Sequence, residues 1–269
     1  MKMPLIAIIE KELRMFFRYP LRVFSAVLVG IIFLIQFVFF GQAVLGGRYS
    51  QLLASSTGIG DYPTYALIGY VLWWLSVSPM EAYVWGIRRE LQRGTFETNI
   101  AAPIRITELL LGLAVSWLIM DSVLMVIVFA FGVLIFDISL TFSILLKSLP
   151  ILLLSFLAFL GFGFIFAGLV MMLKHIGPFA QIFEFAMLFF SGVFFPLNVM
   201  PRAIIEFSKI LPLTHSITAI RGIFVGKTYA EIASSITWLL LLVLVYWLVG
   251  YILFRWAERI TKVMGYGGY

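Results

Sequence analysis

The stretch RRELQRGTFETNIAAPI, Arg88 to Ile104, is the longest charged interruption between two long apolar runs of this chain. Before it, Thr64 to Ile87 supplies 24 mostly apolar residues, and after it Leu109 to Ile135 supplies 27. Both runs exceed the roughly 20 residues that a helix needs to cross a bilayer. A segment this short cannot fold alone. Two interpretations stay open: a rigid docking element for a partner in the water, or a solvated loop whose arginines only fix orientation.

Composition places the whole chain in a membrane. Its 269 residues are 62% hydrophobic and 12% charged, which a soluble domain of this size would not tolerate on its surface. We therefore expect an all-α integral membrane protein with a single domain over residues 1–269. The formal charge of +6 comes from basic residues beside apolar runs, so it indicates topology and not nucleic-acid binding. The absence of cysteine excludes disulfides and cysteine metal sites.

The apolar runs predict six spans. Residues 1–22 form an amphipathic helix that we expect to lie on the membrane surface, broken by Pro20. Residues 23–197 hold five spans, and residues 236–254 hold the sixth, followed by a tail over 255–269. The five are Val23 to Leu45, Thr64 to Ile87, Leu109 to Ile135, Leu149 to Leu173, and Phe179 to Leu197. Gly46 to Pro63 is expected to be an irregular aqueous loop.

Residues 198–231 do not fit a seventh span. Pro201 to Leu211 and Thr214 to Val225 have helical patterns, but each has about half the length of a crossing. We predict a hairpin that enters the apolar layer without crossing it. Such a hairpin must pack against other helices, because exposed backbone ends are not tolerated in lipid.

Six spans place both termini on one side, and the basic residues predict which side. Thirteen lysines and arginines fall on the side of the termini and the central segment, against six on the other. The excess of positive charge marks the cytoplasmic side, so we expect a multi-pass protein with both termini in the cytoplasm and residues 198–231 outside.

Few polar residues lie within the spans. Asp121 is midway along the third span, where an ionisable group is costly unless it meets water, a partner or a proton. It is either a lining residue of a transport path or a hydrogen-bonded group between helices. Gln36 is a further candidate for such a path, or for a hydrogen bond across helices. Glu81 is another candidate, although its place near a span end favours a structural role for it, as it does for Glu184. Glu81 and Glu184 are expected near the cytoplasmic ends of their spans. Gly161, Gly163, Ala167 and Gly168 predict close helix packing.

Motifs for catalysis are missing from the sequence. GIFVGKT, Gly222 to Thr228, resembles a phosphate loop but has Arg221 where that pattern requires glycine. We expect no phosphate-binding role for Lys227 or Thr228. The two histidines, His175 and His215, belong to no metal or hydrolase motif, so we expect neither catalytic residues nor a metal site.

Three stretches, together with the order of the elements, resemble the permease subunit of type-2 ATP-binding-cassette exporters. They are EKELRMFFRYP (Glu10 to Pro20), the central segment, which reads RGTFE over Arg93 to Glu97 and looks like the family's R-x-x-G-T-x-E, and SGVFFPLNVMP with LPLTHSITAIRGI (Ser191 to Pro201 and Leu211 to Ile223). The resemblance implies a cytoplasmic coupling helix between spans two and three that docks on an ATPase. The residues that carry over to it are Arg93, Gly94, Thr95 and Glu97. Pro196, Pro201, Pro212 and Arg221 carry over to an external re-entrant element.

The same resemblance implies the partners. Two permease copies would work with two separate ATP-binding subunits, which would bind ATP and Mg, while this chain holds no cofactor. The substrate class it favours is an amphiphilic drug, antibiotic or lipid-linked molecule, with long-glycan export as the alternative. An accessory protein that only anchors a partner is the competitor from another class. From the residues themselves, Gly94 can end one helix, Thr95 can cap the next, and Phe96 is an apolar knob suited to a partner's groove.

Overall fold

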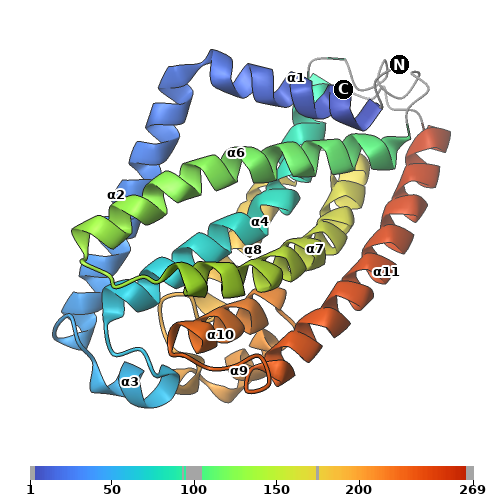
Figure 1. Ribbon diagram of the computed structural model, residues 1–269. Coiled ribbons are helices and arrows are strands. Elements are labelled where there is room, and N and C mark those ends of the chain that lie inside the picture. The colour runs from blue at the N-terminus through green and yellow to red at the C-terminus, as the bar shows by residue number, and fades with distance from the viewer. Residues whose placement is uncertain (1–3, 93, 95–104, 174–175, 265–269) are drawn as a thin grey trace.

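The computed structural model describes residues 4–92, 94, 105–173 and 176–264, and over these residues the chain is helical without a β-strand. The helices are α1 (Pro4–Arg18), α2 (Pro20–Leu45), α3 (Gln51–Thr57), α4 (Tyr62–Gln92), α6 (Ile106–Ile135), α7 (Phe142–Leu173), α8 (Gly177–Phe190), η1 (Leu197–Val199), α9 (Arg202–Ser208), α10 (Pro212–Phe224) and α11 (Ala233–Met264). The long helices alternate between two ends of the molecule (Figure 1). We call the end with α1 the termini end, and the end with α3 and α9 the hairpin end.

Four helices in the described part of the chain are long and apolar enough to cross a membrane: α2, α6, α7 and the Ala233–Thr261 part of α11. Helix α4 has 31 residues but is less apolar, because it carries Glu81, Arg88, Arg89 and Glu90. It is also the centre of the bundle, packed against α2, α6, α7, α8 and α10. The second predicted span therefore exists as a helix that faces protein on most sides.

Two predicted boundaries are wrong. The fifth span was expected over Phe179 to Leu197, but α8 has 14 residues and covers about 21 Å at 1.5 Å per residue. It stops because Gly192 turns the backbone into the left-handed region, with φ +80°. In the fourth span, the helix begins at Phe142 instead of Leu149 and continues through Pro150. The sequence Asp137 to Lys147 is therefore mostly helix and not a loop.

The break between α1 and α2 lies where the sequence predicts it, whereas the connection between α2 and α4 differs from its prediction. Helix α1 ends at Arg18, Pro20 starts α2, and α1 crosses the termini end at a steep angle to α2 (Figure 1). The expected irregular loop from Gly46 to Pro63 instead contains α3. Ser50 caps that helix by accepting from Leu53 N, and Gly58 closes it with φ +80°.

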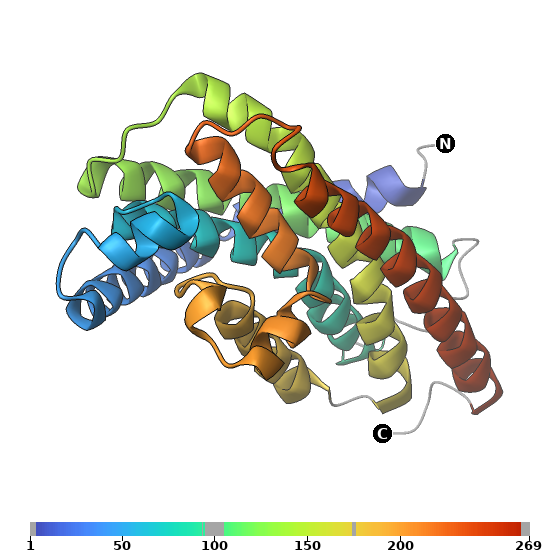
Figure 2. The same cartoon turned by 90° about the horizontal axis from the view of Figure 1, so that it is seen from below.

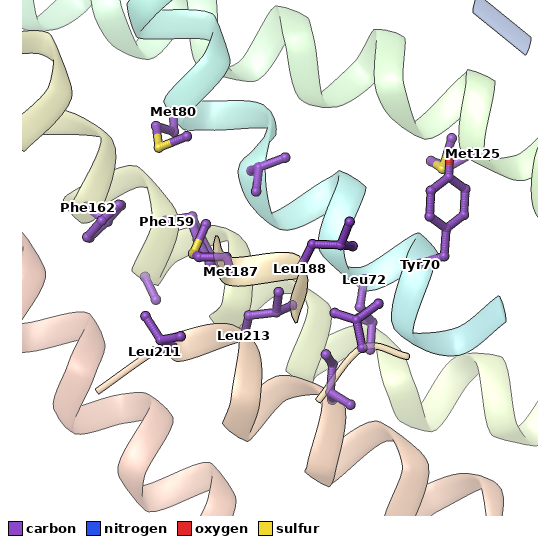
Figure 3. Packing of buried hydrophobic residues seen from close by; sticks show 14 of the residues in the cluster. Tyr70, Leu72, Met80, Met125, Phe159, Phe162, Met187, Leu188, Leu211 and Leu213 are labelled. Carbon is purple, nitrogen blue, oxygen red and sulfur yellow. The ribbon is translucent and has the colours of Figure 1, made fainter. Parts of the chain in front are cut away.

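The half-length helices after α8 are present, and α10 is seated inside the bundle. It packs against α4, α7 and α11, and most of its side chains are buried. Figure 3 shows Leu211 and Leu213 at its start beside Met187 and Leu188 of α8 and Phe159 of α7. Figure 2, viewed from below, shows α10 crossing the bundle between α4 and α11. Its position satisfies the packing requirement for a helix that does not cross the membrane.

The small residues of α7 allow close packing, as predicted. A Cβ atom on Gly161 would lie 2.6 Å from the backbone nitrogen of Trp247 on α11. One on Gly250 would lie 2.1 Å from the carbonyl oxygen of Gly161. The indole N–H of Trp247 also donates to Leu157 O at 2.8 Å. Helices α7 and α11 therefore meet backbone to backbone.

Candidate functional site

The segment that we predict to couple with a partner begins where α4 ends. Arg93, Thr95, Phe96 and Glu97 lie outside the described residues. Gly94 is described: it is exposed, with φ +67°, directly after the end of α4 at Gln92. The expected left-handed glycine after a helix is thus confirmed at this position.

Helix α1 is bound to the last turn of α4. Lys11 Nζ lies 2.8 Å from Glu90 Oε1 and 3.5 Å from Glu12 Oε1. Glu12 Oε2 in turn lies 3.6 Å from Arg89 Nη2. Glu12 is only 4% exposed, so this acid, and not an apolar side chain, occupies the middle of the buried stripe of α1. The opposite charges of Lys11 and Arg89 at close range offset the cost of burying Glu12.

Helix α1 also packs against α6, the helix that follows the predicted coupling segment. Ile8 fits over Gly112, where an added Cβ atom would lie 2.9 Å from Ile8 Cγ2. The guanidinium of Arg89 lies 5.4 Å from the ring centre of Trp117, also on α6. Helix α1 therefore holds together the two helices that flank residues 93–104.

The structure brings together three carboxylates from three helices. Asp121 of α6 is 7% exposed and accepts a hydrogen bond from Ser78 Oγ of α4. Glu81 of α4 lies within Coulombic range of both Asp121 and Glu184 of α8. Glu184 is buried as well, and its Oε1 has no hydrogen-bond partner among the residues that the structure describes. Asp121 sits between helices and not against lipid, and its part in transport stays a prediction.

Glu81 is farther from its helix end than the sequence indicated. Because α4 continues to Gln92, Glu81 lies about three turns inside the helix. Glu184 lies about two turns after the start of α8, as predicted. Gln36 does not join these acids: it is exposed on α2, away from the inward stripe that holds Leu34 and Val38. Of the three path candidates, Asp121 is buried, Glu81 is half-buried and Gln36 is exposed.

Arg221 is the centre of the hairpin end. It is 5% exposed, and its Nη1 donates to Gly192 O at 2.6 Å. Its Nη2 donates to Tyr65 O at 2.9 Å and to Val193 O at 2.7 Å. The guanidinium lies 3.3 Å from the ring centre of Tyr65, whose hydroxyl also donates to Gly192 O. One side chain thus ties α10 to the start of α4 and to the turn after α8.

The three prolines carried over to this region each begin a local element. Pro196 precedes η1, and Pro201 precedes α9. Pro212 occupies the first turn of α10, where its missing N–H leaves no helical bond unmade. They set the path of the chain around Arg221 and bring no reactive group.

GIFVGKT is the end of a helix and not a phosphate loop. Lys227 N donates to Gly222 O, and Gly226 N donates to Ile223 O. With Gly226 at φ +85°, this is a Schellman closure of α10. Its amides point back at helix carbonyls, so they cannot surround a nucleotide phosphate.

Several of these residues were not found by sequence reasoning. Tyr65 and Gly192 have no local pattern that connects them with Arg221, because they are far apart in the chain. Glu12 did have a signal: Ile8, Glu12 and Phe16 are four residues apart and form the buried stripe of α1. The described residues contain no group of three or more histidine, cysteine or acidic side chains arranged to hold a metal ion.

Comparison with known proteins gives one family and two partial relatives. The model of the family described as ABC-2 type transporter matches residues 4–225. Nodulation protein J of Rhizobium meliloti (strain 1021) is 35% identical over 99 residues, which are 34% of this chain and 35% of that protein. Nodulation protein J of Rhizobium leguminosarum bv. viciae is 32% identical over 111 residues, 41% of this chain and 43% of that protein. The chain thus matches less than half the length of each relative.

Proposed function

Since the chain belongs to the ABC-2 type transporter family, we propose that it is the permease subunit of an ATP-driven exporter in the cell membrane. Its substrate is an amphiphilic drug-like, antibiotic or lipid-linked molecule, moved out of the cytoplasm or the inner leaflet. ATP and Mg are bound by a separate ATP-binding subunit. Two copies of that subunit work with two permeases, this chain and a second copy or a homologous one.

One observation carries the coupling part of this proposal: α1 contacts both helices that flank residues 93–104. A partner that displaces this segment pushes on the end of α4 and the start of α6. The contacts of Lys11 with Glu90 and of Ile8 with Gly112 then oblige α1 to move with them. An arrangement of packed helices joined by ion pairs is suited to transmit a displacement as a unit.

Helices α4, α6 and α8 are the elements that we propose to respond to that displacement. They carry Asp121 and Glu184, which are buried, and Glu81, which is half-buried. Ionisable groups at such depth are expensive and commonly mark a path for a polar group or an ion. We propose that part of the substrate path lies beside them.

The test replaces the predicted contact residues of the coupling segment. Phe96→Ala and Glu97→Lys should leave the chain inserted in the membrane but weaken its binding to the ATPase, measured with purified subunits in nanodiscs. Loss of an aromatic anchor costs on the order of 2 kcal/mol, which is about thirtyfold in Kd. Phe142→Ala and Glu206→Lys are the matched controls, because both side chains are exposed at the hairpin end.

Substrate flux distinguishes the proposal from its competitor. The permease proposal is supported if the wild type transports substrate in step with ATP hydrolysis and if only the Phe96 and Glu97 variants bind the ATPase more weakly. ATPase binding without any substrate flux would identify an anchor. Equal binding by all four variants would show that residues 93–104 are a solvated loop.

Polysaccharide or glycolipid export is the alternative substrate class. The partial likeness to Nodulation protein J does not by itself name a substrate. Transport assays with a lipid-linked oligosaccharide and with an amphiphilic drug, side by side, separate the two classes.

A further inference from the structure

A pocket of about 230 Å³ opens at the hairpin end, beside Arg221. It lies between α3, the start of α4, the turn before η1 and the end of α10. The polar side chains that line it are those of Ser56, Thr57, Asn198, Thr218, Arg221 and Lys227, with Tyr65 beside them. This volume is below the range typical of drug-sized ligands, and it suits a small polar group.

The lining is positively charged. Arg221 and Lys227 both contribute to it, and no acidic side chain lines the pocket in the part of the chain that the structure describes. The nearest acid to Lys227 is Glu231, which is exposed and accepts two hydrogen bonds from Thr228, at its N and its Oγ1. Helices α8 and α10 both end here, and each helix end contributes roughly half a negative charge. Two full positive charges exceed that contribution, so the pocket keeps a positive balance.

Hydrogen-bond donors in this lining are unused. Both Nη atoms of Arg221 are bonded to carbonyls and its Nε is covered by protein, so this side chain brings charge but no free donor. Lys227 Nζ and the amide of Asn198 make no hydrogen bond or ion pair among the described residues. These two exposed side chains can therefore donate to an acceptor placed in the pocket.

The hydroxyl groups complete the arrangement. Thr57 Oγ1 donates to Leu53 O at 2.8 Å, and Thr218 Oγ1 donates to Thr214 O at 2.8 Å. Because a hydroxyl can rotate, each can also turn its proton toward a ligand oxygen. The pocket therefore combines two cations, one free amide and several rotatable hydroxyls.

We propose that this pocket binds an oxyanion of phosphate type, either free in the water or carried by the headgroup of a lipid. Lys227 and Arg221 supply the charge, and Asn198 supplies a neutral donor. Nitrogen donors with a full charge bind oxyanions most strongly. The sequence predicts no phosphate-binding role for Lys227, because the spacing of GIFVGKT does not fit a nucleotide loop; this proposal uses the lysine side chain and not the backbone of such a loop. It also does not depend on whether the chain transports anything.

The test measures the thermal unfolding midpoint of the purified full chain in detergent. Inorganic phosphate should raise the midpoint saturably above chloride at equal ionic strength, because a ligand that binds only the folded state stabilises it by mass action. Lys227→Gln should need about tenfold more phosphate for the same rise. Asn198→Ala should weaken the effect as well. Lys147→Gln is the charge-matched control: Lys147 is exposed and does not line the pocket.

A second arm separates the two sources of phosphate. Dioctanoyl phosphatidic acid is compared with dioctanoylglycerol, which lacks the phosphate. If dioctanoyl phosphatidic acid raises the unfolding midpoint at a lower concentration than inorganic phosphate does, the site is assigned to a lipid headgroup. If it has a weaker effect than inorganic phosphate, the site is assigned to the free anion. The proposal is overturned if phosphate gives no saturable rise, if Lys147→Gln loses the effect as fully as Lys227→Gln, or if both variants keep it.

Discussion

At the scale of single residues, Arg221 does most to fix the hairpin end. Its guanidinium donates to three carbonyl groups, one before α4 has completed its first turn and two in the turn after α8. Gly192 O also accepts from the hydroxyl of Tyr65, so it keeps one donor without the arginine. Removing the side chain takes a charged donor from each of the three carbonyls, and a buried group left unsatisfied costs about 1–3 kcal/mol.

Arg221→Met should therefore lower the stability of the chain by several kcal/mol, on the order of 3. The measurement is the thermal midpoint in detergent, together with protease sensitivity of the 191–231 region. Arg202→Met is the control, because Arg202 is exposed at the start of α9 in the same hairpin. Equal midpoints for both variants would show that Arg221 does not fix this region.

His215 gives a prediction about pH. Burial lowers the pKa of His215 below its ordinary 6.5, and the contact of its Nε2 with Lys209 O at 2.8 Å opposes this only in part. The folded chain thus keeps the ring neutral at a pH where the unfolded chain takes up a proton. Stability should fall as the pH drops below about 6.5, since the unfolded state then binds more protons.

The comparison is between wild type and His215→Gln, with thermal midpoints measured from about pH 7.5 to about pH 5.5. Wild type should lose more stability over this range than the variant, because the contributions of all other groups are common to both. Parallel curves would mean that His215 titrates alike in the folded and unfolded chain.

At the scale of elements, the contact of α7 with α11 depends on glycine. Trp247 N would lie 2.6 Å from a Cβ atom at position 161, a distance at which the two helices must separate. Overpacking in a well-packed core costs about 1–3 kcal/mol, and here the obstacle is backbone, which cannot rotate away. The same separation would break the bond from Trp247 Nε1 to Leu157 O.

Gly161→Val should accordingly lower the thermal midpoint and raise the exposure of Trp247, read by fluorescence quenching in a variant whose other tryptophans are replaced. Ser143→Val places the same branched side chain on the same helix at an exposed position and should change little. If Gly161→Val behaves like Ser143→Val, the close approach of α7 and α11 is not needed for stability.

At the scale of the whole molecule, the helices form a bundle whose outer faces are apolar. Helices α2 and α11 are buried over only 17% of their apolar windows and expose many large side chains, such as Phe24, Phe39 and Leu244. Lipid, or the second permease that we propose, covers these faces. The charged network of α1 and α4 lies at one end, and the polar pocket lies at the other (Figure 1).

The excess of basic residues predicts that the termini end faces the cytoplasm. Because the chain has no cysteine, single cysteines can be placed without replacing others. Cysteines at Ser55 and Lys227 should react with an impermeant thiol reagent in whole cells, while one at Thr98 should react only after the membrane is opened. Labelling at Thr98 alone in whole cells would reverse the orientation.

The sequence by itself determined the class of protein and most of its helices. Length and apolarity are summed along the chain, so they identify α2, α6, α7 and α11 without knowledge of any contact. Local backbone chemistry likewise predicted the break at Pro20, the left-handed Gly94 and the two half-length helices of the hairpin. Each of these depends on residues within one or two turns.

Only the tertiary structure decided which distant residues meet. The pairing of Arg221 with Tyr65 and Gly192, the three carboxylates around Asp121, and the bond between Lys11 and Glu90 join segments 29 to 156 residues apart. The early end of α8 also escaped the sequence pattern, because an apolar run continues to Leu197 while the backbone turns at Gly192. An apolar sequence indicates that a segment is buried in protein or lipid. The direction of the segment and its neighbours depend on how the helices pack, and that packing is set by contacts between residues far apart in the chain.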